Sequence, residues 1–196
     1  IAGIFSLVII GLTLSLTAYI STIFSLLFIL FFKNKKLSII LFLILITAGF
    51  FLFQIRQVRF MFNPTGRIEM MKESFKLINK KAITGYGLGS FQYLVGESPE
   101  VVKRLNNENW KEAHNEYGQL GVFETGLVGL MFLLMGIFTV FRTFLKNITR
   151  ETIYLMASFV VFLLVCLTYF PMRIAPLSFY GVVILGILTN KIGEKI

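Results

Sequence analysis

The sequence predicts an all-helical protein that crosses a membrane several times. Of its 196 residues, 56% are hydrophobic and only 15% are charged. Soluble domains carry about 25% charged residues, so the composition excludes an ordinary soluble domain. The 22 Phe and only four Pro exclude a disordered chain, because so much apolar surface does not stay in water. This composition, the long apolar runs and the spacing of the basic residues indicate a polytopic bundle of transmembrane helices with a large extracytoplasmic loop.

The cysteine and histidine content excludes disulfide and zinc chemistry. The chain has one Cys and one His, too few for an intramolecular disulfide or a Cys/His zinc site. Ile1 opens an apolar stretch without the positively charged region that begins a signal peptide. We therefore expect the C-terminal part of a larger membrane protein, beginning within a helix.

The first 32 residues are uncharged, and we expect them to contain two helices. At a rise of about 1.5 Å per residue, they are too long for one hydrocarbon core of about 30 Å. The expected break is the hydroxyl-rich stretch from Thr13 to Thr22, whose side chains can bond freed backbone groups. The predicted N-terminal membrane region is 1–54, with a short cytoplasmic loop at 33–36.

Four further apolar runs come close to the roughly 20 residues that a membrane helix needs. They are residues 37–53, 120–141, 153–170 and 174–188. The last three predict a C-terminal membrane region at 120–190, followed by a cytoplasmic tail at 191–196.

Basic residues predict the orientation, because Lys and Arg accumulate in short cytoplasmic loops. Three clusters alternate along the predicted spans: Lys33, Lys35 and Lys36; Arg142, Lys146 and Arg150; and Lys191 and Lys195. If these clusters are cytoplasmic, residues 55–119 form the extracytoplasmic loop and the turn at 171–173 lies on the same outer side. The net charge of +9 then needs no nucleic acid partner.

The large loop begins with a predicted amphipathic helix that starts near Gly66. Apolar residues recur at helical spacing from Ile68 to Ile78, and basic residues from Arg67 to Lys80 supply another face. Such a helix suits a membrane surface. It either covers the bundle or also guides an anionic lipid substrate, and both alternatives stay open.

Three glycines at alternate positions follow this helix: Gly85, Gly87 and Gly89. Glycine allows positive φ and close backbone approach, so these residues could cradle a phosphate through backbone amides. A plain turn is the alternative. A dinucleotide-binding fingerprint is excluded, because it requires a βαβ unit around the glycines.

His114 is the only histidine and the main candidate for acid–base chemistry. Its ordinary pKa of about 6.5 suits a general base near neutral pH, although a single His is also common as a structural residue. Asn115 follows it, and Trp110 and Tyr117 offer flat faces that suit sugar rings or the membrane interface.

Glu124 and two arginines complete the candidate residues. A carboxylate inside an apolar span is costly without a partner, so we expect Glu124 to pair with an outer-loop arginine or with His114. Arg67 and Arg173 are expected at the outer surface, where a guanidinium could hold a pyrophosphate. Arg173 could instead anchor the chain at the interface. The glutamates between Glu108 and Glu116 fit a solvated helix face, so we expect no metal.

Together these motifs resemble the O-antigen ligase and polysaccharide polymerase family. The likeness covers residues 13–141, and its most specific parts are Ala-His-Asn-Glu-Tyr at 113–117 and Glu-Thr-Gly-Leu-Val-Gly at 124–129, preceded by the glycine turn. The family's earlier Ser-Arg-Gly sequence aligns with residues 13–18, where Leu16 stands in place of the arginine.

The resemblance implies the GT-C type of helical fold found in lipid-dependent glycosyltransferases. It implies transfer of glycan from an undecaprenyl-pyrophosphate donor to a hydroxyl of a glycan or lipid-glycan acceptor, outside the cytoplasmic membrane of a bacterium. The family uses neither metal nor other cofactor. By position, His114 would activate or orient the acceptor and Arg67 would contact the donor pyrophosphate. Substrate binding would involve Gly85, Gly87, Gly89, Trp110, Asn115, Tyr117, Glu124 and Arg173.

The sequence also leaves two other functions possible, a transporter and a scaffold. A transporter or flippase of polysaccharide or lipid-linked oligosaccharide would use the loop as a lid, but transporters usually place ionisable residues or broken helices near the midplane. A membrane scaffold would tolerate loss of His114 and Arg67. Ligase and polymerase differ in their acceptor, which the sequence does not specify.

Overall fold

The computed structural model describes residues 12, 15–54, 67–104, 115–167 and 171–193, and within these ranges the regular elements are all helices. The prediction of an all-helical fold is confirmed. The chain divides into two compact units. The first comprises Ile1–Phe62, Ile148–Val165 and Gly181–Ile196, and the second comprises Asn63–Asn147 and Cys166–Tyr180.

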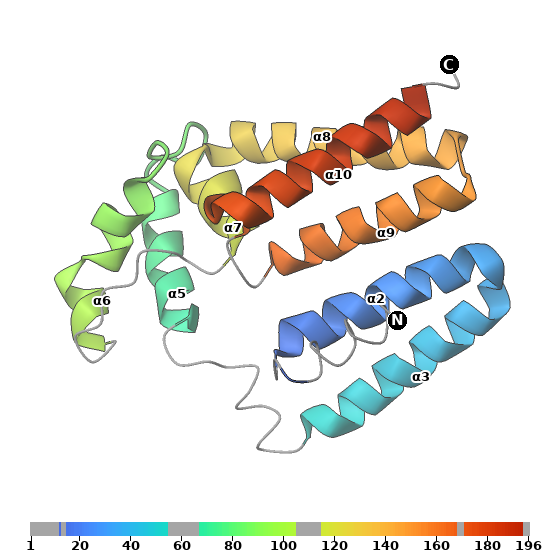
Figure 1. The fold of residues 1–196 in the computed structure, drawn as a ribbon. Coiled ribbons are helices and arrows are strands. Elements are labelled where there is room, and N and C mark those ends of the chain that lie inside the picture. The colour runs from blue at the N-terminus through green and yellow to red at the C-terminus, as the bar shows by residue number, and fades with distance from the viewer. Residues whose placement is uncertain (1–11, 13–14, 55–66, 105–114, 168–170, 194–196) are drawn as a thin grey trace. The chain divides into compact units, whose positions relative to one another are not determined.

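The first unit contains a row of three long helices. In Figure 1, α2 (Leu16–Lys33) lies between α3 (Lys35–Phe53) and α9 (Arg150–Val165) and packs against both. Only Asn34 separates α2 from α3, and its side chain accepts a hydrogen bond from the amide of Leu37 at 3.1 Å. The tight connection makes the two helices an antiparallel pair.

The start of α2 falls within the hydroxyl-rich stretch where the sequence predicts a break. Ser15 has an extended backbone, and its hydroxyl accepts a hydrogen bond from the amide of Ala18 at 3.3 Å. This N-cap satisfies an amide that has no partner within the helix. Of the helix predicted before it, only Leu12 is among the described residues, so the two-helix arrangement stays a prediction.

One of the described helices, α8 (Gly126–Lys146), is long and apolar enough to cross a membrane. The apolar stretches Thr17–Lys33 and Ala175–Asn190 are shorter. Large apolar side chains of α8 are exposed, with Phe132 at 70% and Phe138 at 65%. Exposed apolar surfaces of this kind suit contact with lipid, while the number of spans stays a prediction.

Two predicted spans differ in their bounds from the described helices. The helix α9 ends at Val165, inside the run 153–170, and residues 168–170 lie outside the described residues. The run 120–141 begins with a π-helix, η2 (Gln119–Glu124), and α8 follows only at Gly126, which has a φ of +69°. Glu124 therefore lies before the apolar helix and not one or two turns inside it. The other two runs correspond to α3 and to α10 (Ala175–Gly193).

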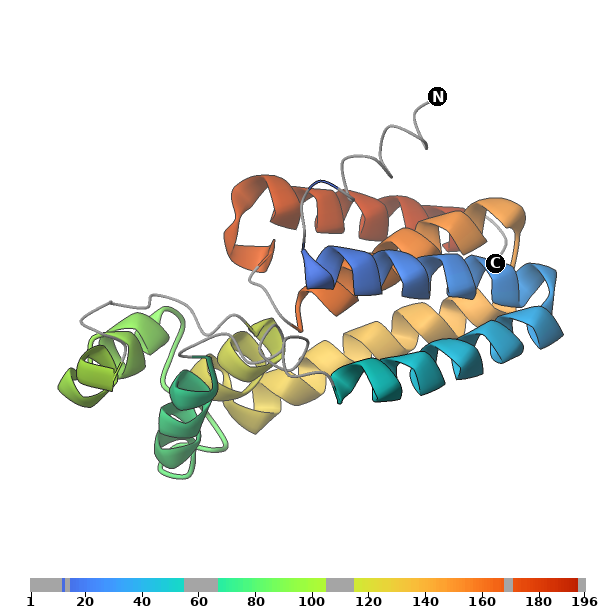
Figure 2. The ribbon, with the colours of Figure 1, turned by 90° about the horizontal axis from the view of Figure 1, so that it is seen from below.

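The second unit contains a small core formed by the fully buried side chains of Phe91, Val95 and Phe123. The helix α5 (Arg67–Ile78) starts where the sequence predicts, and Leu77 and Ile78 at its end pack against this core. The π-helix η1 (Gln92–Gly96) and α6 (Pro99–Arg104) contact α5, and Figure 2 shows α5 and α6 together.

The amphipathic pattern of α5 is only partly used for packing inside this unit. Ile78 contributes to the core, whereas Phe75 is 60% exposed. The buried residues of the helix include Glu73 and Ser74, and Glu73 pairs with Lys76 at 2.8 Å. An exposed Phe on a helix that carries basic residues is compatible with the predicted position on a membrane surface.

The glycine turn packs directly on the backbone that precedes α8. The amides of Tyr86 and Gly87 donate to the carbonyls of Phe123 and Glu124, at 2.9 Å each. Gly85 has a φ of +68°, and a Cβ at this position would collide with the Glu124 carbonyl group. Both the backbone conformation and the lack of space therefore require glycine at position 85.

Replacement of Gly85 should show how much the second unit depends on this contact. Gly85→Ala is expected to cost several kcal/mol of unfolding free energy, because the new methyl group meets the Glu124 backbone. Gly87→Ala is the matched control: its φ is also positive, at +99°, but the surrounding space is open. It should cost only about 1–2 kcal/mol, from backbone conformation. Thermal unfolding in detergent compares the two, and equal losses would contradict the packing role of Gly85.

Candidate functional site

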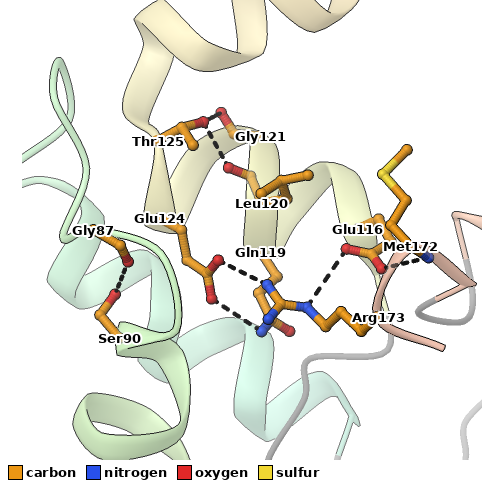
Figure 3. A network of polar contacts seen from close by, with 10 residues as sticks. All are labelled: Gly87, Ser90, Glu116, Gln119, Leu120, Gly121, Glu124, Thr125, Met172 and Arg173. Atoms are coloured by element: carbon orange, nitrogen blue, oxygen red, sulfur yellow. Dashed lines mark hydrogen bonds and ion pairs between the residues drawn. The ribbon is translucent and has the colours of Figure 1, made fainter. Parts of the chain in front are cut away.

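The candidate site is a cluster of charged residues in the second unit, shown in Figure 3. Glu116 comes from the one-turn helix α7 (Glu116–Gly118), Glu124 ends η2, and Arg173 ends the short 3₁₀ helix η3 (Pro171–Arg173). We call these three residues the carboxylate–arginine cluster. It joins chain segments that are 49 residues apart in sequence.

Arg173 is shared by the two carboxylates. Its Nη2 donates to Oε2 of Glu124 at 2.7 Å, and its Nε lies 3.7 Å from Oε2 of Glu116. The glutamate side chains are each 1% exposed, whereas the Arg173 side chain is 24% exposed. Buried carboxylates need such compensation, because desolvation of an unpaired charge is expensive. Arg173 is therefore the cation that allows both glutamates to be buried.

Two neutral donors complete the surroundings of the carboxylates. Nε2 of Gln119 donates to Oε1 of Glu124 at 3.2 Å, and the amide of Met172 donates to Oε1 of Glu116 at 3.1 Å. Each of the four carboxylate oxygens thus faces a nitrogen atom, as Figure 3 shows. This arrangement gives the cluster a defined geometry and leaves a net formal charge of about −1 when all three groups are ionised.

The π-helix explains why Gln119 reaches Glu124. In an α-helix, residues five apart point about 140° away from each other. A π-helix has i to i+5 periodicity, so the side chains of Gln119 and Glu124 lie on one side and form their hydrogen bond. The hydroxyl of Thr125 then donates to the carbonyl of Leu120 at 2.6 Å, which closes the segment.

The backbone directly after His114 is fixed by several contacts. Asn115 is extended, and its Oδ1 accepts a hydrogen bond from the amide of Gly118 at 2.9 Å. The amide of Glu116 donates to the carbonyl of Cys166 at 2.9 Å. Asn115 thus acts as a helix cap. His114 itself lies outside the described residues, but the chain that follows it is held from two directions.

The structure assigns clear positions to some predicted site residues. The expected pairing of Glu124 with an arginine is confirmed, and the arginine is Arg173. Tyr117 is half-buried, and burial raises the pKa of its hydroxyl, with a smaller contribution from the nearby Cys166 thiol. Tyr117 therefore stays protonated near neutral pH and can serve as a hydrogen-bond donor but not as a base.

Two backbone amides of the glycine turn form hydrogen bonds within the protein. The amide of Gly85 donates to Lys81 and that of Gly87 donates to Glu124, both at 2.9 Å. These two amides are already engaged, which favours the plain-turn interpretation over a phosphate cradle at these positions. Gly89 has a φ of +78° and open surroundings, and its contact with a substrate stays a prediction.

Other predicted residues are not brought into the cluster by the described part of the chain. Trp110 lies outside the described residues, as does His114, and Arg67 is described only as the first residue of α5. No group of three His, Cys, Asp or Glu that could hold a metal ion occurs within the described ranges.

Sequence reasoning missed two members of this site. Glu116 was expected on a solvated face, and this is wrong, because its side chain is 1% exposed and faces Arg173. The sequence does not indicate that Gln119 belongs to the site, because a spacing of five residues from Glu124 does not match the α-helical repeat. The one available hint was Asn115, whose capping tendency places Glu116 in the first turn of a helix.

A double-mutant cycle should measure the strength of the carboxylate–arginine cluster. Arg173→Met is expected to cost about 2–4 kcal/mol of unfolding free energy, because it leaves two buried carboxylates without their cation. Glu124→Gln should cost less, since Glu116 still faces Arg173. The two losses should not add, with a coupling of at least about 1 kcal/mol.

The control for this cycle is Lys76→Met, which breaks the Lys76–Glu73 pair of the same unit. The Lys76 side chain is 60% exposed and that of Glu73 is 11% exposed, so loss of Lys76 should cost clearly less than loss of Arg173, whose two carboxylate partners are each 1% exposed. Thermal or denaturant unfolding in detergent provides the measurement. Additive losses at Arg173 and Glu124 would refute a direct coupling between them.

Comparison with known proteins identifies the relationship of the chain. The family model described as O-antigen ligase matches residues 1–134. This range contains the glycine turn, His114 and both glutamates of the carboxylate–arginine cluster. The search of curated proteins found no match, and neither did the search of solved structures. Because the matched range is more than half of the 196 residues, the chain belongs to the O-antigen ligase family.

Proposed function

We propose that this protein transfers glycan from an undecaprenyl-pyrophosphate carrier to an acceptor hydroxyl at the outer face of a bacterial cytoplasmic membrane. The observation that carries the proposal is the family match over residues 1–134. Ligase or polymerase activity follows from that family. The lipid-linked donor, the multi-pass membrane arrangement and the independence from metal are the proposed details.

His114 is the proposed general base or orienting group for the acceptor. The acceptor oxygen attacks the anomeric carbon of the donor sugar, and the bond from that carbon to the pyrophosphate oxygen breaks. The hydroxyl proton passes to His114, whose ordinary pKa suits this role. Transfer of this kind requires a fixed base, because small displacements reduce the rate strongly.

The contacts that follow His114 support this role. The cap at Asn115, the bond from the Glu116 amide to Cys166 and the carboxylate–arginine cluster all hold the chain close to position 114. We therefore assign Glu116, Glu124 and Arg173 as positioning residues. Two carboxylates already engage Arg173. We therefore assign another residue as the main cation that binds the donor pyrophosphate.

Arg67 is the proposed cation for the leaving pyrophosphate. It is the first residue of α5, and the N-terminus of a helix also favours an anion through its dipole. A cation at the leaving group stabilises the charge that develops as the sugar bond breaks. Trp110 and Tyr117 are proposed to contact sugar rings through their flat faces.

The function is tested in cells that carry the full-length gene. His114→Ala and Arg67→Ala should each reduce surface polysaccharide by about 100-fold or more, the usual effect of losing an acid–base or charge-stabilising group. Lipid-linked repeats should accumulate. Gels of surface polysaccharide and mass spectrometry of extracted lipids provide the measurement.

Lys80→Ala is the control, because Lys80 is exposed and lies in the turn after α5. It should leave the glycan profile unchanged. A normal profile in His114→Ala at equal expression would reject the catalytic role of His114. Accumulation of lipid-linked repeats at the cytoplasmic face, and not at the outer face, would support a flippase instead.

A further inference from the structure

The first unit contains a cavity of about 550 Å³ at the junction of α2 and α9. Its walls include Ile29 and Lys33 from the end of α2, and Ile148, Arg150, Ile153 and Tyr154 from the beginning of α9 and the residues just before it. Figure 1 shows that the C-terminal end of α2 and the N-terminal end of α9 lie at the same end of this unit. The proposed glycosyl transfer makes no use of these residues.

Some of the residues that line the cavity are positively charged or able to donate hydrogen bonds. Lys33 and Arg150 supply two cations, and Tyr154 adds a hydroxyl group to the same lining. The described residues that line the cavity include no acidic side chain. Glu151, the adjacent residue on α9, is exposed and is not part of the lining. These residues therefore suit an anion with several acceptor oxygens.

The chain that carries Arg150 is held in place before any ligand binds. The hydroxyl of Thr149 accepts from the amide of Thr152 at 3.2 Å, and the hydroxyl of Thr152 accepts from the amide of Thr149 at 2.8 Å. These reciprocal bonds form a capping arrangement at the start of α9. A fixed backbone lowers the entropy that binding costs.

The cavity also has an apolar part of its lining. It is formed by the isoleucine side chains at positions 29, 148 and 153. A small hydrophilic anion gains nothing from these isoleucines, whereas a molecule with an anionic head and a hydrocarbon body gains from both the cations and the isoleucines of the lining. The combination selects an amphiphile.

We infer that this cavity binds an anionic phospholipid, with Lys33 and Arg150 on the phosphate and the isoleucines along the acyl chains. Basic pockets between membrane helices are suited to such headgroups. Both cations belong to clusters that the sequence assigns to the cytoplasmic side. The lipid would then come from the cytoplasmic leaflet, and its binding does not depend on the proposed transfer activity.

The test uses the purified full-length protein in neutral detergent. Dioleoyl phosphatidylglycerol, dioleoyl phosphatidylcholine and inorganic phosphate are titrated separately, and binding is followed by native mass spectrometry and thermal unfolding. Phosphatidylglycerol should bind and raise the unfolding temperature, while the other two should do so much less. Lys33→Gln/Arg150→Gln should weaken phosphatidylglycerol binding by roughly 10- to 30-fold, as expected for the loss of two cations near a lipid phosphate.

The matched control is Lys35→Gln/Lys36→Gln. It removes the same charge from neighbouring positions, but neither residue lines the cavity, and Lys35 instead lies 5.6 Å from the centre of the Phe31 ring. Its affinity for phosphatidylglycerol should change less than threefold. Tyr154→Phe is a milder second variant that should weaken binding severalfold by removing one hydroxyl.

Three outcomes would overturn the inference. Equal weakening in both double variants would indicate attraction to the whole basic surface and not to the cavity. Equal binding of phosphatidylcholine would remove the requirement for net negative charge. Equal stabilisation by inorganic phosphate would assign the cavity to a free anion and not to a lipid.

Discussion

A carboxylate buried away from water is stable as an ion only when a cation and hydrogen-bond donors compensate its lost hydration. The second unit of this protein buries two carboxylates, Glu116 and Glu124, and Arg173 compensates both. The need for that pairing fixes the turn at 171–173 against the segment 116–124. The same pairing fixes the end of η2, directly before the start of α8. The position of the candidate site thus depends on this one electrostatic requirement.

Close backbone packing supplies the second constraint on the same segment. The glycine turn bonds to the carbonyls of Phe123 and Glu124, and the amides of Leu127 and Val128 bond back to Ala82 and Ile83. Gly85 and Gly126 both have positive φ, and a Cβ on either would collide with the backbone of the other segment. The glycines therefore act here by bringing two stretches of main chain together. The entry to α8 is held by carboxylate pairing on one side and by backbone contact on the other.

These constraints suit a membrane enzyme whose proposed chemistry lies in a loop. A loop is a poor support for a base unless other parts of the chain hold it. Here the residues that follow His114 are held by a cap, by a backbone bond to Cys166 and by the carboxylate–arginine cluster. The cavity between α2 and α9 belongs to the first unit, and we propose that it binds an anionic phospholipid. The chain thus separates a proposed site of transfer from a proposed site of lipid binding.

The sequence alone determined the helical class, the start of α5 and the need of Glu124 for a partner, because these follow from composition, short-range periodicity and the cost of a buried charge. Family membership was also predicted from the motifs between Arg67 and Gly129. Tertiary structure decided that Arg173 is the partner, that Glu116 is buried and that α8 begins only at Gly126. It also brought Lys33 and Arg150 into the lining of one cavity. Such facts depend on contacts between residues far apart in the chain and on a π-helix that breaks the α-helical repeat, and neither leaves a periodic signal in the sequence.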